Sequence, residues 1–291
     1  MIVRKKRESA GGRRGFEGST YKLTVEYEGT RYSGWQAQTN TPKTVQGRLL
    51  GAASQLFTQA DIGGAGRTDA GVHAAGQVAH LRAEGRMPPE EVAWKMNELL
   101  PHDIHILSAS SVPAGFHARH DAVQRVYLYQ ISARRAAFAK PFVWWIKDRL
   151  DVARMSKAAA AIPGKHDFAG FCDRRNTSES TLVVVDSVEV AAAGDLILVR
   201  IAASHFLWKM VRKLVAALVE IGRGEFDIDT FQELINDPQD QTFLPTAAPS
   251  GLFLEAVLYE GEVFDRPLKP LVSVESWSPR TSVRKGSRGH R

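Results

Sequence analysis

The segment from residue 64 to residue 74 places a single acid, Asp69, between Arg67 and several glycines. Gly64, Gly66 and Gly71 have no Cβ, so the main chain here can approach a ligand closely. Arg67 and Asp69 are two residues apart, and in an extended segment such side chains point to the same side. A guanidinium beside a carboxylate favours the ionised form of the carboxylate. The pattern suits a nucleophilic carboxylate, although a structural ion pair in a tight loop would show the same spacing.

Two further groups of side chains have types and spacings that suit chemistry or binding. Tyr127 and Tyr129 alternate with apolar residues in a predicted strand, so their rings share one face, and only one of them need line a binding site. Lys209, Arg212 and Lys213 recur at three- and four-residue intervals, so on a helix they share a basic face. That face suits RNA phosphates, and the alternative is a solvated helix surface.

The histidines do not predict a metal site. His102 and His105 form one close pair, and His117 and His120 form another. The two pairs lie on dissimilar segments, and no Asp, Glu or Cys accompanies them at the spacing of metal ligands. We therefore expect surface or capping histidines and no bound metal.

The net charge of +6 over 291 residues is concentrated in the tails. Residues 1–20 and residues 271–291 each carry a net charge of +4, which leaves −2 for the 250 residues between them. Any nucleic-acid surface on the folded part must therefore be a local patch, and the tails serve either as solubilising extensions or as salt-sensitive RNA contacts. The single cysteine, Cys172, excludes an intramolecular disulfide and agrees with a reducing compartment. The absence of long apolar runs argues against membrane insertion, so we expect a cytoplasmic protein.

Hydrophobic periodicity predicts strands that alternate with helices. Strands are expected at residues 21–28, 77–82, 104–107, 125–133, 182–190, 196–202 and 252–259. Helices are expected at residues 44–57, 88–100, 152–162, 205–222 and 228–236, with Gly222 as a C-cap of the longest. Residues 108–115 read as a break between two halves, and the segment around His166, together with residues 173–180, reads as a long loop. The order favours an α+β fold, with helices on one face of a mainly antiparallel sheet.

The stretch from Gly64 to Ala74 resembles the catalytic loop of the tRNA pseudouridine synthase A family. Other stretches resemble motifs of the same family in the same order, over residues 21–260. They are Gly34-Trp35-Gln36-x-Gln38, Thr44-Val45-Gln46, Phe116-His117-Ala118-Arg119, Arg125-x-Tyr127-x-Tyr129, His166-Asp167-Phe168, Phe206-Leu207-x-x-Met210-Val211-Arg212 and Ala248-Pro249-Ser250-Gly251-Leu252.

The resemblance implies two ferredoxin-like halves joined in one sheet, and a homodimer. On these terms residues 1–20 are a basic extension expected to be disordered, 21–112 form the N-terminal half, 113–262 form the C-terminal half, and 263–291 are a basic tail. The implied activity is conversion of uridine to pseudouridine in the anticodon stem-loop of tRNA, at positions 38–40. Such an isomerisation requires no cofactor and no metal.

The resemblance also implies roles for individual residues. Asp69 is the nucleophile that attacks ribose C1′ or uracil C6, and Arg67 orders Asp69 and fills the space that a flipped base leaves. Tyr127 stacks on the base and takes part in proton removal. Leu252 packs against the uracil, and Arg212 lies near the aspartate.

The chain departs from the family pattern at the start of the predicted long helix. Trp208-Lys209 stands where an aromatic residue or arginine followed by histidine is usual, and Lys213 replaces a common asparagine. Lys209 and Lys213 are candidate RNA contacts. One alternative function is an RNA-binding or tRNA-folding factor that has lost turnover. Another is a metal-dependent hydrolase, which would need a bound metal ion that these histidines do not obviously supply.

Overall fold

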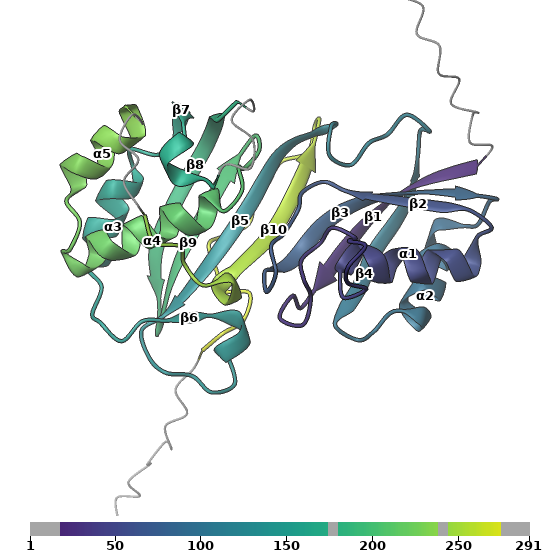
Figure 1. The fold of residues 1–291 in the computed structure, drawn as a ribbon, viewed down its shortest axis with the longest axis horizontal. Helices are drawn as coiled ribbons and strands as arrows, with labels where there is room; N and C mark the ends of the chain where they lie inside the picture. The colour runs from purple at the N-terminus through teal and green to yellow at the C-terminus, as the bar shows by residue number, and fades with distance from the viewer. Residues whose placement is uncertain (1–17, 174–179, 238–243, 275–291) are drawn as a thin grey trace, which may run out of the picture. The chain divides into compact units, whose positions relative to one another are not determined.

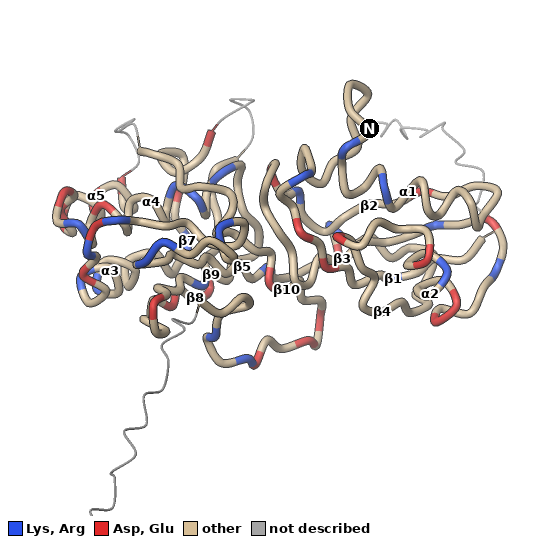
Figure 2. The backbone as a smooth tube through the Cα atoms, turned by 90° about the horizontal axis from the view of Figure 1, so that it is seen from below, with Lys and Arg blue, Asp and Glu red and all other residues tan. Residues whose placement is uncertain are grey.

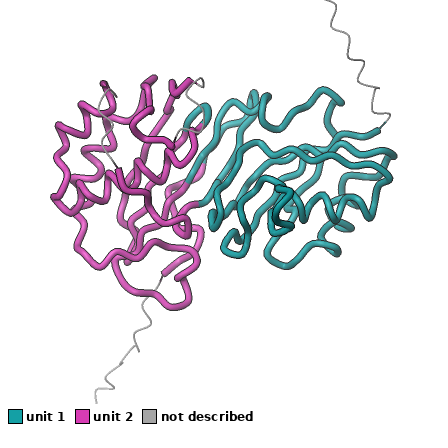
Figure 3. Tube along the Cα trace, in the orientation of Figure 1, with its two compact units in different colours: residues 1–127, 203–205, 253–265 teal, residues 128–202, 206–252, 266–291 magenta. Residues whose placement is uncertain are grey.

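A computed structural model describes residues 18–173, 180–237 and 244–274. The chain divides into two compact units, which are coloured separately in Figure 3. Unit 1 takes the described residues up to Tyr127, with Ala203–His205 and Phe253–Asp265, and unit 2 takes the other described residues. Residues 1–17 and 275–291, which contain most of the predicted basic tails, lie outside the described residues.

Unit 1 contains strand–helix–strand–strand–helix–strand. Its elements are β1 (Gly18–Tyr27), α1 (Val45–Leu56), β2 (Ala60–Gly64), β3 (His73–Glu84), α2 (Pro89–Leu99) and β4 (Ile104–Val112). β1 lies between β4 and β3, β2 pairs with the other edge of β3, and all three pairings are antiparallel (Figure 1). This strand order, 4-1-3-2, is that of a ferredoxin-like unit.

Local sequence accounts for the helices of unit 1. The hydroxyl of Thr44 accepts a hydrogen bond from the Gly47 amide at 3.2 Å and caps the start of α1. Pro89 starts α2, and Glu90 and Glu91 occupy its first turn, where the helix dipole favours negative charge. The two helices contact each other, while α1 also contacts β2 and α2 contacts β4, so both cover the same face of these strands.

The second half of the chain repeats the same topology without a repeat in sequence. Its elements are β5 (Ala122–Ser132), β6 (Trp144–Trp145), α3 (Val152–Ala159), β7 (Gly164–Asp167), β8 (Leu182–Ala193), β9 (Leu196–Ala203), α4 (Met210–Arg223), α5 (Ile228–Asn236) and β10 (Leu252–Tyr259). The sheet order β10-β5-β9-β8 is again 4-1-3-2, with β7 added beside β8. β5 and β10 each have residues in both units.

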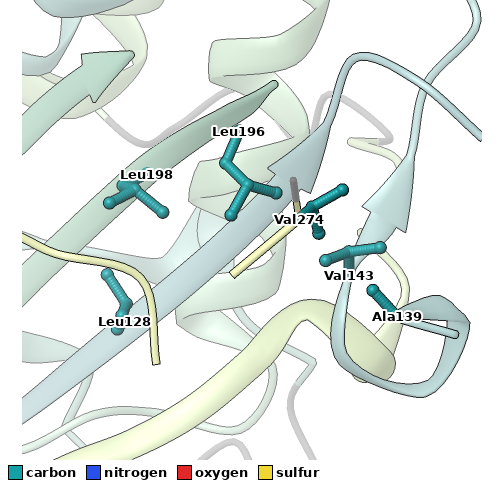
Figure 4. Packing of buried hydrophobic residues seen from close by; sticks show 6 residues of the cluster. All are labelled: Leu128, Ala139, Val143, Leu196, Leu198 and Val274. Atoms are coloured by element: carbon teal, nitrogen blue, oxygen red, sulfur yellow. The ribbon is translucent and has the colours of Figure 1, made fainter. Parts of the chain in front are cut away.

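The interior of unit 2 is apolar and built from distant segments. α3 packs against α4, α5 and β8, and ten of the 14 residues of α4 are buried. Figure 4 shows a cluster made by Leu128, Ala139, Val143, Leu196, Leu198 and Val274. Burial of such side chains is the main favourable term in folding.

The predicted α+β fold with a mainly antiparallel sheet is confirmed. The strand predicted at 21–28 and the helix predicted at 44–57 agree with β1 and α1 within a few residues. The helix at 228–236 and the strand at 252–259 are found with the predicted bounds. Strong period-3.6 or period-2 patterns with clear caps explain these successes.

The predicted helix at 205–222 starts and ends too early. α4 begins at Met210, and residues 205–209 are irregular, because Lys209 has a φ of +63° that breaks a right-handed helix. The helix continues through Gly222 and is capped by Gly224, whose φ is +86°. Gly222 instead packs closely against Met155 of α3, where an added Cβ would lie 2.9 Å from the Met155 side chain.

Two predicted irregular segments contain strand. β4 continues to Val112 through mostly exposed small residues, which pair with β1, so residues 108–112 are not a break. His166 and Asp167 lie in β7 and pair with β8 rather than in a long loop. Most of the rest of that predicted loop, residues 174–179, lies outside the described residues.

The predicted boundary at residues 112–113 falls at the end of β4, in the connection between the two topological repeats. The compact units divide later, within β5, and residues 253–265 belong with unit 1. The boundaries of the halves remain predictions. Acidic and basic residues, coloured red and blue on the backbone tube of Figure 2, occur in elements of both units.

Candidate active site

Residues 65–72 form the loop between β2 and β3 that carries Asp69. Backbone hydrogen bonds hold it at both ends. The Trp35 amide donates to the Thr68 carbonyl at 3.0 Å, and the Val72 amide donates to the Asp69 carbonyl at 3.1 Å. Gly71 has a φ of +78°, a conformation that favours glycine. Asp69 therefore starts a tight turn that is closed by the bond between its carbonyl and the Val72 amide.

Two glycines outside residues 64–74 leave room for this loop to pack. A Cβ added to Gly34, which has a φ of +96°, would lie 2.6 Å from the Thr68 carbonyl oxygen. A Cβ added to Gly29 would lie 1.9 Å from the Val72 carbonyl oxygen. The close approach of main chain that the motif glycines suggested is thus provided largely by the segment that follows β1.

Buried neutral side chains form hydrogen bonds with the loop. The hydroxyl groups of Thr68 and Tyr27 are 2.8 Å apart and hydrogen bonded. The Gln77 side chain donates to the Gly66 carbonyl at 2.9 Å and accepts from the Gly66 amide at 3.3 Å. Burial raises the pKa of Tyr27 to about 12, although its bonds to Thr68 and Gln77 act in the opposite direction. Tyr27 is therefore neutral at physiological pH.

The side chains of Arg67 and Asp69 lie on the outer side of the loop. Arg67 is exposed, Thr68 is buried and Asp69 is half-buried, which is the alternation expected of an extended segment. The Arg67 Nε donates to the Gln36 Oε1 at 2.9 Å. Among the described residues, the side-chain hydrogen bond of Arg67 is thus made to Gln36. The ordering of Asp69 by Arg67 remains a prediction.

Tyr127 lies beside the same loop. Its side chain is buried, and its hydroxyl is 3.8 Å from the position that a Cβ of Gly66 would take. Burial raises the pKa of Tyr127, and the neighbouring Tyr27 and the negative charge of Asp69 raise it further. The phenol of Tyr127 is therefore neutral at physiological pH and feels the charge of Asp69, while a shared catalytic role of the two residues remains a prediction.

Arg125 anchors the loop to three other segments. Its guanidinium is buried and donates to carbonyl oxygens at 2.6–3.2 Å. The four acceptors belong to Ala65, Arg119, Ala122 and Ser204. Burial lowers its pKa, but an arginine remains charged. The first residue of the loop at residues 65–72 is thus fixed to β5 and to the segment that follows β9.

In unit 2, Arg212 and Leu252 occupy defined positions. The Arg212 Nε donates to the Ala247 carbonyl at 2.7 Å, and the Ala247 amide donates to the Arg212 carbonyl at 3.1 Å. Tyr129 is a core residue whose hydroxyl donates to the Ala248 carbonyl at 2.6 Å. Leu252 is buried at the start of β10. Arg212 thus ties α4 to the segment that leads into β10.

Lys209 and Lys213 do not form an open basic helix face. Lys209 precedes α4 and is the one non-glycine residue with positive φ in the described part of the chain. Its Nζ lies 2.5 Å from Asp173 Oδ2, and the Lys213 Nζ lies 2.9 Å from Asp173 Oδ1. The two ammonium groups lower the pKa of Asp173. The acid therefore offsets one of their two charges.

The chain matches a known protein family. A family model described as tRNA pseudouridine synthase matches residues 23–121 and 158–260, which is more than half of the chain. The chain belongs to this family. Asp69 and Arg67 lie in the first matched segment, and the four candidate residues of unit 2 lie in the second, whereas Tyr127 lies between the two.

Curated relatives match along nearly their whole length. The tRNA pseudouridine synthase A of Afipia carboxidovorans is 41% identical over 243 residues, which cover 82% of this chain and 99% of the relative. That of Xanthobacter autotrophicus is 40% identical with the same coverage. The tRNA pseudouridine synthase A 2 of Bacillus cereus is 34% identical, again over 82% of this chain and 99% of the relative.

The sequence did not reveal most of the side chains that hold the loop at residues 65–72. Gln36 and Gln46 were quoted only as parts of matching motifs, and Tyr27 and Gln77 only as strand residues. Their contacts join positions that are 10 to 50 residues apart, which spacing along the chain does not reveal. A buried glutamine in an apolar strand was the available signal, because buried polar groups require partners.

Three of the histidines lie beside one another with tilted rings. The ring centroids of His80 and His117 are 4.6 Å apart, and those of His117 and His120 are 4.2 Å apart. Burial lowers the pKa of His80 to about 4, and Arg82 and His117 add to the effect. Within the described residues no three His, Cys, Asp or Glu side chains are grouped to hold a metal ion. No helix in that part of the chain could span a membrane.

Proposed function

We propose that the protein converts uridine to pseudouridine in tRNA and that Asp69 is the nucleophile. The observation that carries the proposal is the position of Asp69 on an anchored loop beside the buried, neutral phenol of Tyr127. Membership of the tRNA pseudouridine synthase family and the relatives named tRNA pseudouridine synthase A support the substrate. The enzyme class is an isomerase.

The reaction exchanges one glycosidic bond for another. The N1–C1′ bond of uridine breaks and a C5–C1′ bond forms, while C5 loses a proton and N1 gains one. Substrate and product have the same composition, so no electrons are transferred overall. The Asp69 carboxylate forms a temporary covalent bond with ribose C1′ or with uracil C6 and is released at the end, which divides one difficult step into easier ones.

Tyr127 and Arg67 have separate roles in this proposal. Tyr127 stacks on the uracil and takes part in removing the C5 proton. Because its pKa is raised, the phenol is protonated at neutral pH, so it accepts the C5 proton only as it passes its own proton to water. Arg67 orders Asp69 and occupies the space from which the target base has been flipped.

We assign substrate contacts in unit 2 to Leu252, Arg212, Lys209 and Lys213. Leu252 packs on uracil, and the three cations contact RNA phosphates or the reacting nucleotide. The target uridines are at positions 38–40 of the anticodon stem-loop, the protein acts as a homodimer, and it works in the cytoplasm. The family resemblance supports these finer assignments.

Tritium release tests the activity. Unmodified tRNA labelled with tritium at uridine C5 is incubated with the parent protein and with the Asp69→Asn and Asp69→Ala variants, in buffer without added metal. We expect release by the parent and a fall of at least about 1,000-fold in both variants, because neither can form the covalent bond. Thermal unfolding and tRNA binding provide controls for folding.

The outcomes separate the alternatives. Silence from the parent with retained tRNA binding would support an inactive RNA-binding or tRNA-folding factor. Release that requires added zinc would support metal-dependent chemistry. Mapping of pseudouridine along the product tRNA tests the anticodon assignment, and modification away from positions 38–40 would contradict it.

A further inference from the structure

A chain of side-chain amides leads from β2 to the exposed guanidinium of Arg67. The Gln46 Nε2, from α1, donates to the Ile62 carbonyl of β2 at 2.6 Å. The Gln46 Oε1 accepts from the Gln36 Nε2 at 2.7 Å. The Gln36 Oε1 in turn accepts from the Arg67 Nε at 2.9 Å. The two glutamines thus connect a strand backbone to a proposed active-site cation.

The donor and acceptor directions along this chain are fixed. A backbone carbonyl only accepts hydrogen bonds, so Gln46 must turn its NH₂ group toward Ile62 and its oxygen away. The Ala37 amide also donates to this oxygen, at 2.8 Å. Gln36 must then present its NH₂ group to Gln46, which leaves its oxygen facing Arg67. That oxygen suits a guanidinium, which has donors only.

Gln36 engages Arg67 at one nitrogen. The Nε is bonded to Gln36, and among the described residues the two terminal nitrogens make no side-chain hydrogen bond. An exposed arginine has many rotamers, and a bond at Nε restricts the plane of the guanidinium while leaving Nη1 and Nη2 available to a ligand. The bond at Nε thus positions Nη1 and Nη2 as a pair of hydrogen-bond donors.

We propose that Gln36 is a positioning residue that acts through Arg67. It orients the guanidinium before RNA binds, so that Nη1 and Nη2 meet the RNA at the place from which the target uridine departs. The inference rests on the proposed function, because the role of Arg67 matters only if uridine is isomerised. The side-chain hydrogen bonds of Gln36 run to Gln46 and Arg67.

A double-mutant cycle tests this coupling. Gln36→Met has a side chain of similar length without a strong acceptor, and it is combined with Arg67→Ala. The kcat and KM for tritium release from tRNA are measured for the parent, both single variants and the double variant. We expect Gln36→Met to lower kcat by about 10- to 100-fold, since misplaced groups cost up to ~100-fold. We expect the double variant to match Arg67→Ala alone, because Gln36 has no effect without its partner.

Two further variants separate positioning from folding. Gln36→Glu keeps an acceptor for Arg67 but loses the donor to the Gln46 Oε1, so we expect it to recover part of the activity that Gln36→Met loses. Gln38→Ala is the matched control, because Gln38 belongs to the same segment but donates to the Ser33 carbonyl and not to Arg67. Its kcat should equal that of the parent. Melting temperatures are measured for all variants.

The result that would overturn the inference is clear in each case. If the parent releases tritium and Gln36→Met has the same kcat, the inference is wrong while the proposed function stands. Additive losses in the double variant would also overturn it, because Gln36 would then act independently of Arg67. If Gln36→Met fails to fold, a Gln36→Glu variant that folds but is as inactive as Arg67→Ala overturns it. A silent parent overturns the proposed function itself, and the inference with it.

Discussion

The loop at residues 65–72 in unit 1 and the start of α4 in unit 2 both carry charged side chains, but they are held differently. The loop is fixed through its backbone carbonyls, one of which accepts from the buried Arg125 guanidinium, and through the neutral hydroxyl of Tyr27, which bonds to Thr68. At the start of α4 the two lysines are held by Asp173. At α4 an acid thus offsets part of the lysine charge, whereas the bonds that hold the loop are made to its backbone and to the Thr68 hydroxyl.

The comparison predicts that the loop is most sensitive to changes in its packing. Gly34→Ala would place a Cβ 2.6 Å from the Thr68 carbonyl at a φ of +96°. We expect a loss of at least about 2 kcal/mol in the free energy of unfolding, because the strained φ alone costs about 1–2 kcal/mol. Activity should be lost together with stability.

Chemical denaturation and tritium release measure this effect. Gly115→Ala is the control, because nothing lies within 4 Å of its added Cβ. It should change the free energy of unfolding by less than about 0.5 kcal/mol. A fully stable and active Gly34→Ala variant would show that the loop tolerates displacement, and the contrast between the two regions would fail.

Thr68→Val tests the neutral support with a smaller change. Valine has nearly the same shape but leaves the Tyr27 hydroxyl without this partner. We expect a loss of about 1 kcal/mol in stability, because the Tyr27 hydroxyl loses this hydrogen bond while it keeps the one from Gln77. The kcat should also fall, because the neighbouring Asp69 shifts with the backbone.

The measurements are urea denaturation and steady-state kinetics, with Thr24→Val in β1 as the control. Thr24 is partly exposed, and its variant should behave like the parent. If Thr68→Val loses stability but keeps its kcat, the Tyr27 bond serves folding alone.

Asp173→Asn gives the smallest predicted effect and acts on unit 2. Removing the carboxylate charge releases the charge of Lys209 and Lys213, so tRNA affinity at low salt should rise by a few fold and fall more steeply with added salt. The loss in stability should be below about 1 kcal/mol, because the pair is partly exposed. Binding at two salt concentrations measures the first effect, with Glu225→Gln as a control of equal charge change. Equal affinity of the two variants would mean that these lysines do not contact RNA.

The same ion pair predicts a dependence on pH. The pKa of Asp173 is lowered in the folded protein, mainly by hydrogen bonds from Lys209 and Lys213. A lowered pKa stabilises the fold above the ordinary carboxyl pKa, and this contribution is lost as pH falls through the depressed value. The stability difference between parent and Asp173→Asn should therefore be full above about pH 4 and shrink below it. A difference that grows on acidification would contradict the assignment.

Sequence predicted the parts of this site that depend on local periodicity. The outward placement of Arg67 and Asp69 follows from alternation, and the bounds of α5 and β10 follow from caps and apolar spacing. The start of α4 could not be predicted in this way, since the apolar spacing from Phe206 to Met210 continues through residues that are not helical. The positive φ of Lys209 and its bond to Asp173, 36 residues away, decide that boundary.

The buried polar contacts were also beyond local reasoning. The Arg125 guanidinium joins carbonyls from residues 60 positions before it to 79 positions after it. Such a network depends on the packed fold, and any one of its acceptors looks like an ordinary loop carbonyl in the sequence. Motif order identified Arg125 as a marker of the family, but its role emerged only from the structure.

The pairing of β10 with β3 has a consequence for biosynthesis. Phe253 and Leu254 lie beside His73 and Ala74, where the loop at residues 65–72 enters β3, and the Tyr259 hydroxyl donates to the Ala118 carbonyl. Unit 1 therefore cannot be completed until the ribosome has made residues close to position 265. For most of its synthesis, a nascent chain therefore contains Asp69 but lacks the strand that borders its loop. Unit 1 can complete its folding only when translation is nearly over.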